Sequence, residues 1–151
     1  RAMAVSRYQF GEEATQALFR GNVELIKSRK TGKIRNVISD GEHILSMRAP
    51  DGMYSLRVEG AKRITESVPA PHMRVVLMDD AVPFVSKGRN AFCQFITSCD
   101  EELVPMDEAI LVDKDDNVIA TGRLNVIANE IASLKKGIAV KVRSGSGDDE
   151  A

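Results

Sequence analysis

The fold of the second half of the chain is decided by its last predicted strand, Ile138-Ala139-Val140-Lys141-Val142-Arg143 (residues 138–143). Successive side chains of a strand point to opposite faces of the sheet, so strict alternation predicts a strand with one buried face. Here Ile138, Val140 and Val142 share one face, which we expect to be buried. Lys141 and Arg143 share the other face, where we expect them side by side in solvent.

Short strands precede this one at close spacing. About six strands in roughly 70 residues predict a small mixed β pseudo-barrel with short helices, closed or nearly closed. Pro83–Gly88 is predicted as a turn or one helical turn, and Asn129–Lys136 as a short helix with Asn129 as its N-cap and Gly137 just beyond its end. The other predicted strands are Met73–Met78, Asn90–Thr97, Ala109–Val112, Val118–Thr121 and Leu124–Ala128.

A boundary between two units is predicted at Ser67–Pro71, where two prolines interrupt both helical and strand periodicity. The predicted fold class is therefore α+β. We expect an N-terminal α/β-hairpin domain over residues 6–68, the pseudo-barrel over residues 73–143, and a flexible tail over residues 144–151. Residues 1–3 contain a candidate start methionine after a candidate tag remnant, and the fold prediction leaves them out.

The N-terminal domain is predicted to consist of hairpins between two helices. Asp40-Gly41 is typical of a two-residue hairpin turn, and Pro50-Asp51-Gly52 of another tight turn. The acidic residues at the start of the first helix suit the positive end of its dipole. The predicted helices are Glu12–Phe19 and Glu59–Ser67, and the predicted strands are Val23–Lys27, Ile34–Ile38, His43–Arg48 and Met53–Val58.

Composition excludes several classes of protein. Of 151 residues, 43% are hydrophobic and 28% are charged, which is typical of a soluble globular protein. No apolar run approaches the roughly 20 residues of a membrane helix and no secretory leader is visible, so we expect a cytoplasmic protein without membrane contact. Cys93 and Cys99 fit no zinc pattern, so we expect reduced thiols, no metal and no cofactor.

The charge is nearly balanced overall but is unevenly distributed. The net charge is −1, which by itself argues against a nucleic-acid partner. Basic residues nevertheless gather at Arg20–Arg35 and Arg123–Arg143, whereas the acids concentrate at Asp100–Asp116 and in the tail. Segregated charge creates a local potential that the net charge conceals.

Several motifs of the second half occur together in a characteristic order. They are Ala81-Val82-Pro83-Phe84-Val85-Ser86-Lys87-Gly88-Arg89-Asn90-Ala91-Phe92, Pro105-Met106-Asp107-Glu108, Ala120-Thr121-Gly122-Arg123 and Lys136-Gly137 with the last strand. With these motifs, residues 73–143 resemble a PUA domain, a small pseudo-barrel found on RNA-modifying enzymes. The resemblance implies that fold and an RNA partner.

The first half carries its own set of motifs. They are Tyr8-Gln9-Phe10-Gly11, residues 23–37, Gly41-Glu42-His43 and Arg48-Ala49-Pro50-Asp51-Gly52. With these motifs, the first half is similar to the segment that precedes the PUA domain in the archaeosine tRNA-guanine transglycosylase family. The resemblance implies an archaeal source and a separately encoded C-terminal half of a split enzyme. The family's large catalytic barrel, with its nucleophilic aspartate and zinc cysteines, has no counterpart here, so a separate catalytic subunit is expected.

The stretch Lys87-Gly88-Arg89-Asn90 is the first candidate RNA contact. Glycine allows the backbone to approach a phosphate closely, and Lys87 and Arg89 neutralise it. The resemblance places RNA contact at this helix-to-strand edge and brings the last strand beside it. The alternative, an ordinary glycine turn with two solvated charges, stays open.

Two further basic groups are candidate contacts. Lys135, Lys136, Lys141 and Arg143 belong to the last predicted helix and strand, where they contact RNA or simply keep an edge strand soluble. The hairpin at residues 27–35 carries the densest basic stretch and has no aromatic residue for base stacking. It suits backbone contact, a solvated turn or docking to a protein partner. Its candidate residues are Arg29, Lys30, Lys33 and Arg35.

The leading hypothesis is an RNA-binding protein, the tRNA-binding and non-catalytic subunit of a split transglycosylase that holds the acceptor stem or CCA end. The alternative is a protein-interaction or general RNA-binding module of another RNA-modifying complex. Catalysis by the chain itself is not expected, because no nucleophile with a neighbouring base is visible. Phe84, Phe92 and Phe95 are spaced as core residues rather than as stacking platforms.

Overall fold

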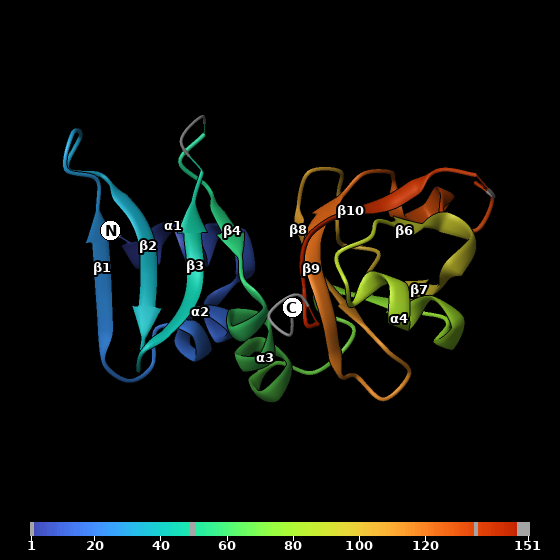
Figure 1. Cartoon of the computed structure of the whole chain (residues 1–151), viewed down its shortest axis with the longest axis horizontal. Helices are drawn as coiled ribbons and strands as arrows, with labels where there is room; N and C mark the ends of the chain where they lie inside the picture. The colour runs from blue at the N-terminus through green and yellow to red at the C-terminus, as the bar shows by residue number, and fades with distance from the viewer. Residues whose placement is uncertain (1, 49–50, 135, 148–151) are drawn as a thin grey trace. The chain divides into compact units, whose positions relative to one another are not determined.

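The computed structural model describes residues 2–48, 51–134 and 136–147 (Figure 1). The chain divides into two compact units, Arg1–Val68 and Pro69–Ala151. Each unit has its own sheet, of four strands in the first and six in the second. The structure is therefore α+β, as the sequence predicts.

The first unit is an antiparallel sheet in the order β1-β2-β3-β4 with three helices, of which α1 and α2 lie behind the sheet in Figure 1. Asp40 (φ 51°) and Gly41 (φ 81°) join β2 to β3 with the two positive φ angles of a type I′ turn, which confirms the predicted hairpin. The elements are α1 (Ala2–Phe10), α2 (Glu12–Leu18), β1 (Val23–Lys27), β2 (Ile34–Ser39), β3 (Glu42–Met47), β4 (Tyr54–Leu56) and α3 (Val58–Ser67).

A buried arginine on α3 connects the helices of this unit to its sheet. Arg63 donates to the Leu18 carbonyl (3.3 Å), to Ser39 Oγ (2.7 Å) and to the Ser39 carbonyl (2.9 Å). It also forms an ion pair with Glu42 at 3.3 Å. A buried guanidinium requires such a set of acceptors, because an unsatisfied buried charge is costly.

The helix α1 was not predicted. It begins at Ala2 and therefore includes Ala2 and Met3, which the fold prediction leaves out. The Tyr54 hydroxyl donates to the Ala2 carbonyl at 3.0 Å, and the Gln9 side chain bonds to the backbone of Tyr54 in both directions. Contacts with β4, rather than amphipathic periodicity, therefore position this helix.

The second unit is a six-stranded sheet in the order β6-β10-β9-β8-β5-β7, in which β5 and β8 pair in parallel. Its two edge strands, β6 and β7, are joined by the three residues of η2, so the sheet curls until its edges nearly meet. This is the predicted pseudo-barrel. The elements are β5 (Arg74–Leu77), η1 (Asp79–Ala81), α4 (Val82–Val85), β6 (Ala91–Phe92), η2 (Cys93–Phe95), β7 (Ile96–Cys99), β8 (Glu108–Val112), β9 (Val118–Leu124), η3 (Ala128–Glu130) and β10 (Ile138–Gly145).

The last strand follows the predicted alternation only in part. Val140 is fully buried, Val142 packs against the core and Lys141 is exposed. Ala139 is also fully buried, although the alternation places it on the outer face. The core that β10 covers is built from small and branched side chains, including Val75, Leu111 and Leu124.

Several local predictions for this unit differ from the structure; of the predicted strand Leu124–Ala128, only Leu124 lies in a strand. Asn129–Lys136 is not a continuous helix, because only η3 is helical there and Asn129 lies inside it rather than capping it. Asn90–Thr97 is interrupted by η2. Ser144 and Gly145, which the prediction assigns to the tail, belong to β10, and the Ser146 amide donates to the Ile119 carbonyl at 2.8 Å. Residues 148–151 of that predicted tail lie outside the described residues.

Candidate nucleic-acid interface

The helix α4 ends in a tight glycine turn. Gly88 N donates to the Val85 carbonyl (2.9 Å), and the amides of Lys87 and Arg89 donate to the Phe84 carbonyl (3.2 and 3.3 Å). Gly88 has a φ of 96°, a conformation that favours glycine. The side chains of Lys87 and Arg89 are exposed on either side of it. The predicted stretch is thus a solvent-facing turn with two cations.

The C-terminal end of β10 packs directly against this turn. A Cβ on Gly145 would lie 2.2 Å from the Ser86 carbonyl oxygen and 2.9 Å from Gly88 N. Gly147 N donates to the same Ser86 carbonyl at 2.8 Å. Asn90 Oδ1 accepts from Val142 N at 2.9 Å, so Asn90 attaches the turn to the strand. The turn and the end of β10 form one surface.

Two basic side chains lie across the adjacent strands. Lys141 pairs with Arg123 of β9, and Arg123 pairs with Glu108 of β8, so all three side chains are on one face of the sheet. Arg123 was not singled out from the sequence, because only the register between β9 and β10 shows that it lies opposite Lys141.

Arg143 has a different environment from Lys141. Its two terminal nitrogens contact the two Glu108 oxygens at 2.6 and 2.9 Å, and Glu108 is only 3% exposed. A bidentate pair of this kind is charge-assisted and geometrically specific. The Arg143 guanidinium therefore neutralises a buried carboxylate, whereas Lys141 faces solvent.

Lys136 is exposed, but it lies at the opposite end of β10 from the glycine turn. The strand rises about 3.3 Å per residue. Ile138, where β10 begins, therefore lies roughly 13 Å along the strand from Val142, the residue that Asn90 contacts, and Lys136 precedes Ile138 by two residues. The structure does not bring this predicted contact together with Lys87 and Arg89. Lys135, named with it, lies outside the described residues.

Two of the three phenylalanines assigned to the core are on the surface. Phe84 is 58% exposed and Phe92 is 43% exposed, whereas Phe95 packs against the core. The Phe84 carbonyl closes the glycine turn. Its ring is therefore an exposed aromatic surface on the element that carries Lys87 and Arg89.

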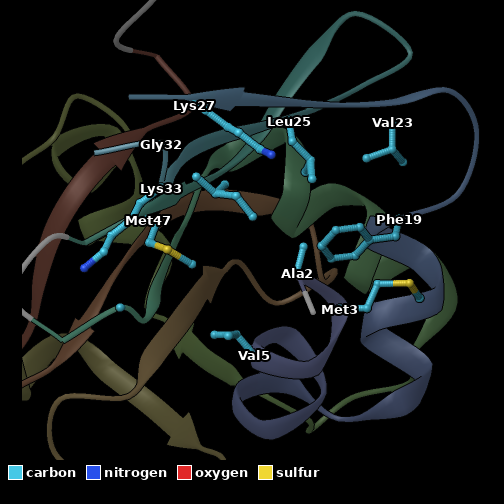
Figure 2. A pocket seen from close by; sticks show the side chains of 12 residues that line it. Ala2, Met3, Val5, Phe19, Val23, Leu25, Lys27, Gly32, Lys33 and Met47 are labelled. Atoms are coloured by element: carbon cyan, nitrogen blue, oxygen red, sulfur yellow. The ribbon is translucent and has the colours of Figure 1, made fainter. Parts of the chain in front are cut away.

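The basic hairpin of the first unit is well ordered by backbone contacts. Ser28 N donates to the Lys33 carbonyl (2.8 Å), and Gly32 N donates to the Ser28 carbonyl (2.9 Å). Arg29, Lys30 and Arg35 are exposed. Lys33 is exposed too, but together with Lys27 it lines an apolar hollow of about 870 Å³, which Figure 2 shows from close by.

A serine–histidine contact on β3 bears on whether the chain contains a nucleophile with a neighbouring base. Ser46 Oγ lies 3.0 Å from His43 Nε2 and donates to Asn36 Oδ1 at 3.2 Å. Burial, and secondarily the Arg57 charge, lowers the pKa of His43, which favours a neutral ring. Because the serine proton is directed to Asn36, the imidazole is left as donor. That is the reverse of general-base activation.

No metal-binding cluster of three or more His, Cys, Asp or Glu side chains occurs within the described residues. The acidic run near Asp113 is a hydrogen-bonded turn, in which Asp113 Oδ1 accepts from the amides of Asp115 and Asn117, both at 2.9 Å. Burial alone raises the pKa of Asp113, but hydrogen bonds from Asn117 and Asp115 outweigh it and lower that pKa.

Among the helices of the described ranges, none has the length and apolar character needed to cross a bilayer.

Cys99 should be a slow nucleophile. Burial, and to a smaller extent the Asp100 charge, raises the pKa of its thiol to about 11. Since the thiolate is the reactive form, alkylation of the native protein by iodoacetamide should increase with pH up to about 11, as mass spectrometry would record. Cys99 in the urea-denatured protein serves as the control and should react near the ordinary thiol pKa of about 8.5. A native half-maximal rate near that lower pH would contradict the burial seen here.

The chain matches two family models in succession. Residues 1–71 match the model of the patch-forming domain C2 of tRNA-guanine transglycosylase, and residues 73–145 match the model of the PUA domain. The two matches meet close to the boundary between the two compact units, Val68 and Pro69.

Two archaeal enzymes align with nearly the whole chain. The chain is 45% identical over 143 residues to the tRNA-guanine(15) transglycosylase of Thermococcus onnurineus, a match that covers 95% of the chain and 24% of that enzyme. It is 39% identical over 145 residues to the enzyme of the same name from Methanobrevibacter smithii, covering 96% of the chain and 22% of that enzyme. The chain thus spans about a quarter of the length of these relatives.

Two solved structures share the fold over nearly the whole chain. A hypothetical protein from Pyrococcus horikoshii superposes with a TM-score of 0.77 at 21% identity, covering 98% of this chain and 89% of that one. A conserved PUA domain protein from Thermoplasma acidophilum superposes with a TM-score of 0.69 at 19% identity, covering 97% and 87%. At these identities the similarity establishes the fold alone.

Proposed function

Since the chain consists of a patch-forming domain C2 of tRNA-guanine transglycosylase followed by a PUA domain, we propose that it is the tRNA-binding, non-catalytic part of an archaeosine tRNA-guanine transglycosylase. A separate catalytic subunit then performs the reaction, in which a guanine in the D-arm of tRNA is exchanged for a 7-deazaguanine precursor. The observation that supports this proposal most is the exposed glycine turn beside the basic end of β10.

The geometry of that turn suits a phosphate backbone. Lys87 and Arg89 are exposed on both sides of a glycine, where the main chain can approach an anion closely. Lys141 and Arg123 extend the positive surface across β10 and β9. Phosphate contacts of this kind supply affinity without reading sequence. The turn and Lys141 are therefore the proposed primary contacts, whereas Arg143 and Asn90 position the strand and the turn.

The exposed ring of Phe84 suggests which part of tRNA lies at the turn. An aromatic side chain stacks on unpaired bases, and such stacking contributes about 1–3 kcal/mol per base. In tRNA the CCA end is unpaired and adjoins the acceptor stem. We therefore place the acceptor stem on the basic surface and the CCA end on Phe84. Arg29, Lys30 and Arg35 of the hairpin offer a secondary contact.

A separate hold on tRNA is useful to this reaction. Exchange of a base requires that the nucleotide be extracted from its stack, which costs a few kcal/mol. Binding free energy from a remote surface can offset this cost without taking part in the chemistry. This explains why a domain without a visible catalytic group would belong to the enzyme.

Binding of tRNA with and without its CCA end tests the proposal. The purified chain should bind intact tRNA roughly tenfold more tightly than tRNA that lacks CCA, as about 1.4 kcal/mol of stacking would give. The Phe84→Ala variant should lose that difference and bind both forms alike, as fluorescence anisotropy would show. Phe92→Ala is the matched control and should keep it. Absence of tRNA binding, or base exchange by the chain alone, would contradict the proposal.

A further inference from the structure

An apolar hollow of about 870 Å³ lies between α1 and the β1 side of the sheet in the first unit (Figure 2). Two of the twelve residues that line it are lysines, and apart from two glycines the others are apolar. Leu25, Ile34 and Met47 contribute from three neighbouring strands. The opposite wall is formed by Ala2, Met3 and Val5 of α1 together with Phe19.

The hollow adjoins an apolar edge strand. Within the described residues β1 pairs with β2 alone, so its other edge has no strand partner. Leu25 is 39% exposed and the neighbouring Ile26 is 46% exposed. Soluble proteins usually protect an edge strand with charges, bulges or a covering segment, because exposed apolar edges aggregate. Of these two residues Leu25 lines the hollow, whereas Ile26 points to the other face of the strand, so the exposed Leu25 beside the apolar walls indicates a surface that another polypeptide covers.

The charge of the hollow limits the chemistry of the segment that can bind there. Figure 2 shows Lys27 and Lys33 toward the end of the hollow that contains Gly32, and Phe19 and Val23 toward the other end. A phosphate backbone would neutralise the two lysines but would leave the apolar walls exposed to water. An apolar peptide segment bordered by carboxylates satisfies both features. Protein therefore fits this surface better than RNA does.

The relatives indicate which protein supplies such a segment. Only 24% of the Thermococcus onnurineus enzyme and 22% of the Methanobrevibacter smithii enzyme correspond to this chain. We infer that the hollow docks the catalytic part of the transglycosylase, through an apolar segment flanked by acidic side chains. The inference rests on the proposed function for the identity of the partner. It assigns Lys27 and Lys33 to protein docking and leaves tRNA to the glycine turn, with Arg29, Lys30 and Arg35 as the secondary contact.

Association with the catalytic subunit tests the inference. The probe is the complete catalytic transglycosylase polypeptide of the source organism, titrated with the full chain in a calorimeter. Leu25→Glu should weaken association at least tenfold, because it places a carboxylate in the apolar wall. Ile26→Glu is the matched control: the same change on the same strand, at a residue that does not line the hollow. It should stay within twofold of the wild type.

The charge reversal Lys27→Glu/Lys33→Glu keeps the test valid if Leu25→Glu fails to fold, because both lysines are exposed. This double variant should also weaken association at least tenfold and should lower tRNA affinity much less than that, because Lys27 and Lys33 are not among the proposed tRNA contacts. Reduced tRNA affinity with unchanged association would overturn the inference and assign the hairpin to RNA. If the wild-type chain associates with itself and Leu25→Glu abolishes this self-association, the inference is overturned, and the hollow binds a second copy of the chain instead. If the wild-type chain fails to bind tRNA but still associates with the catalytic polypeptide, only the proposed function is refuted.

Discussion

Replacing Gly145 by alanine should destabilise the second unit by roughly 2–3 kcal/mol, which lowers its melting temperature by about 10 °C or more. The new Cβ would lie 2.2 Å from the Ser86 carbonyl oxygen and 2.6 Å from the Ser86 carbonyl carbon. These are backbone atoms, which cannot move aside as the end of a flexible side chain does. Either β10 or the glycine turn must therefore shift. The hydrogen bond from Gly147 N to the Ser86 carbonyl, 2.8 Å in the structure, would be lost with that shift.

Thermal unfolding followed by circular dichroism measures this effect. Ser146→Ala is the matched control, because it changes the next residue and keeps the backbone hydrogen bond from Ser146 N to Ile119. It should stay within about 0.5 kcal/mol of the wild type. Because Gly145→Ala changes the packing between β10 and the turn that carries Lys87 and Arg89, it should also weaken tRNA binding below the melting temperature. A Gly145→Ala protein that melts with the wild type would mean that β10 and the turn are not in close contact.

The double variant Lys87→Ala/Arg89→Ala should bind tRNA roughly thirtyfold more weakly than the wild type, at about 1 kcal/mol for each lost phosphate contact. Both side chains are exposed, so stability should change little. The control variant Lys62→Ala/Lys114→Ala removes the same charge from exposed lysines that pair with Glu59 and Asp79 instead. Anisotropy titrations should show the control within about threefold of the wild type. Equal weakening in both variants would mean that net charge, rather than the glycine turn, governs binding.

Much of the fold follows from local patterns in the sequence. The alternation from residue 138 to 143 correctly places Val140 inside and Lys141 outside. Asp40-Gly41 and Gly88 occur where positive φ angles are needed, so the turns around them are predictable. These features depend on the conformational preferences of a few neighbouring residues, which a single sequence contains.

The errors concern features that depend on distant residues. The sequence contains no signal for the contact of α1 with Tyr54, which is made across the unit. Arg143 and Glu108 are 35 residues apart, so the ion pair that occupies Arg143 is set by strand register alone. Phe84 has a core-like spacing, yet the four residues of α4 turn only Val85 fully inward. Register and burial of this kind are properties of the tertiary structure.

The salt dependence of tRNA binding tests most directly the claim that positive charge gathered at the glycine turn holds an RNA backbone. Each phosphate contact contributes about 0.9 to the slope of log affinity against log salt. With about five contacts, the wild type should lose on the order of 10²–10³ in affinity between 50 and 200 mM salt, and Lys87→Ala/Arg89→Ala should have a slope about two units shallower. A wild-type affinity that does not change with salt, or a variant with the wild-type slope, would contradict the claim.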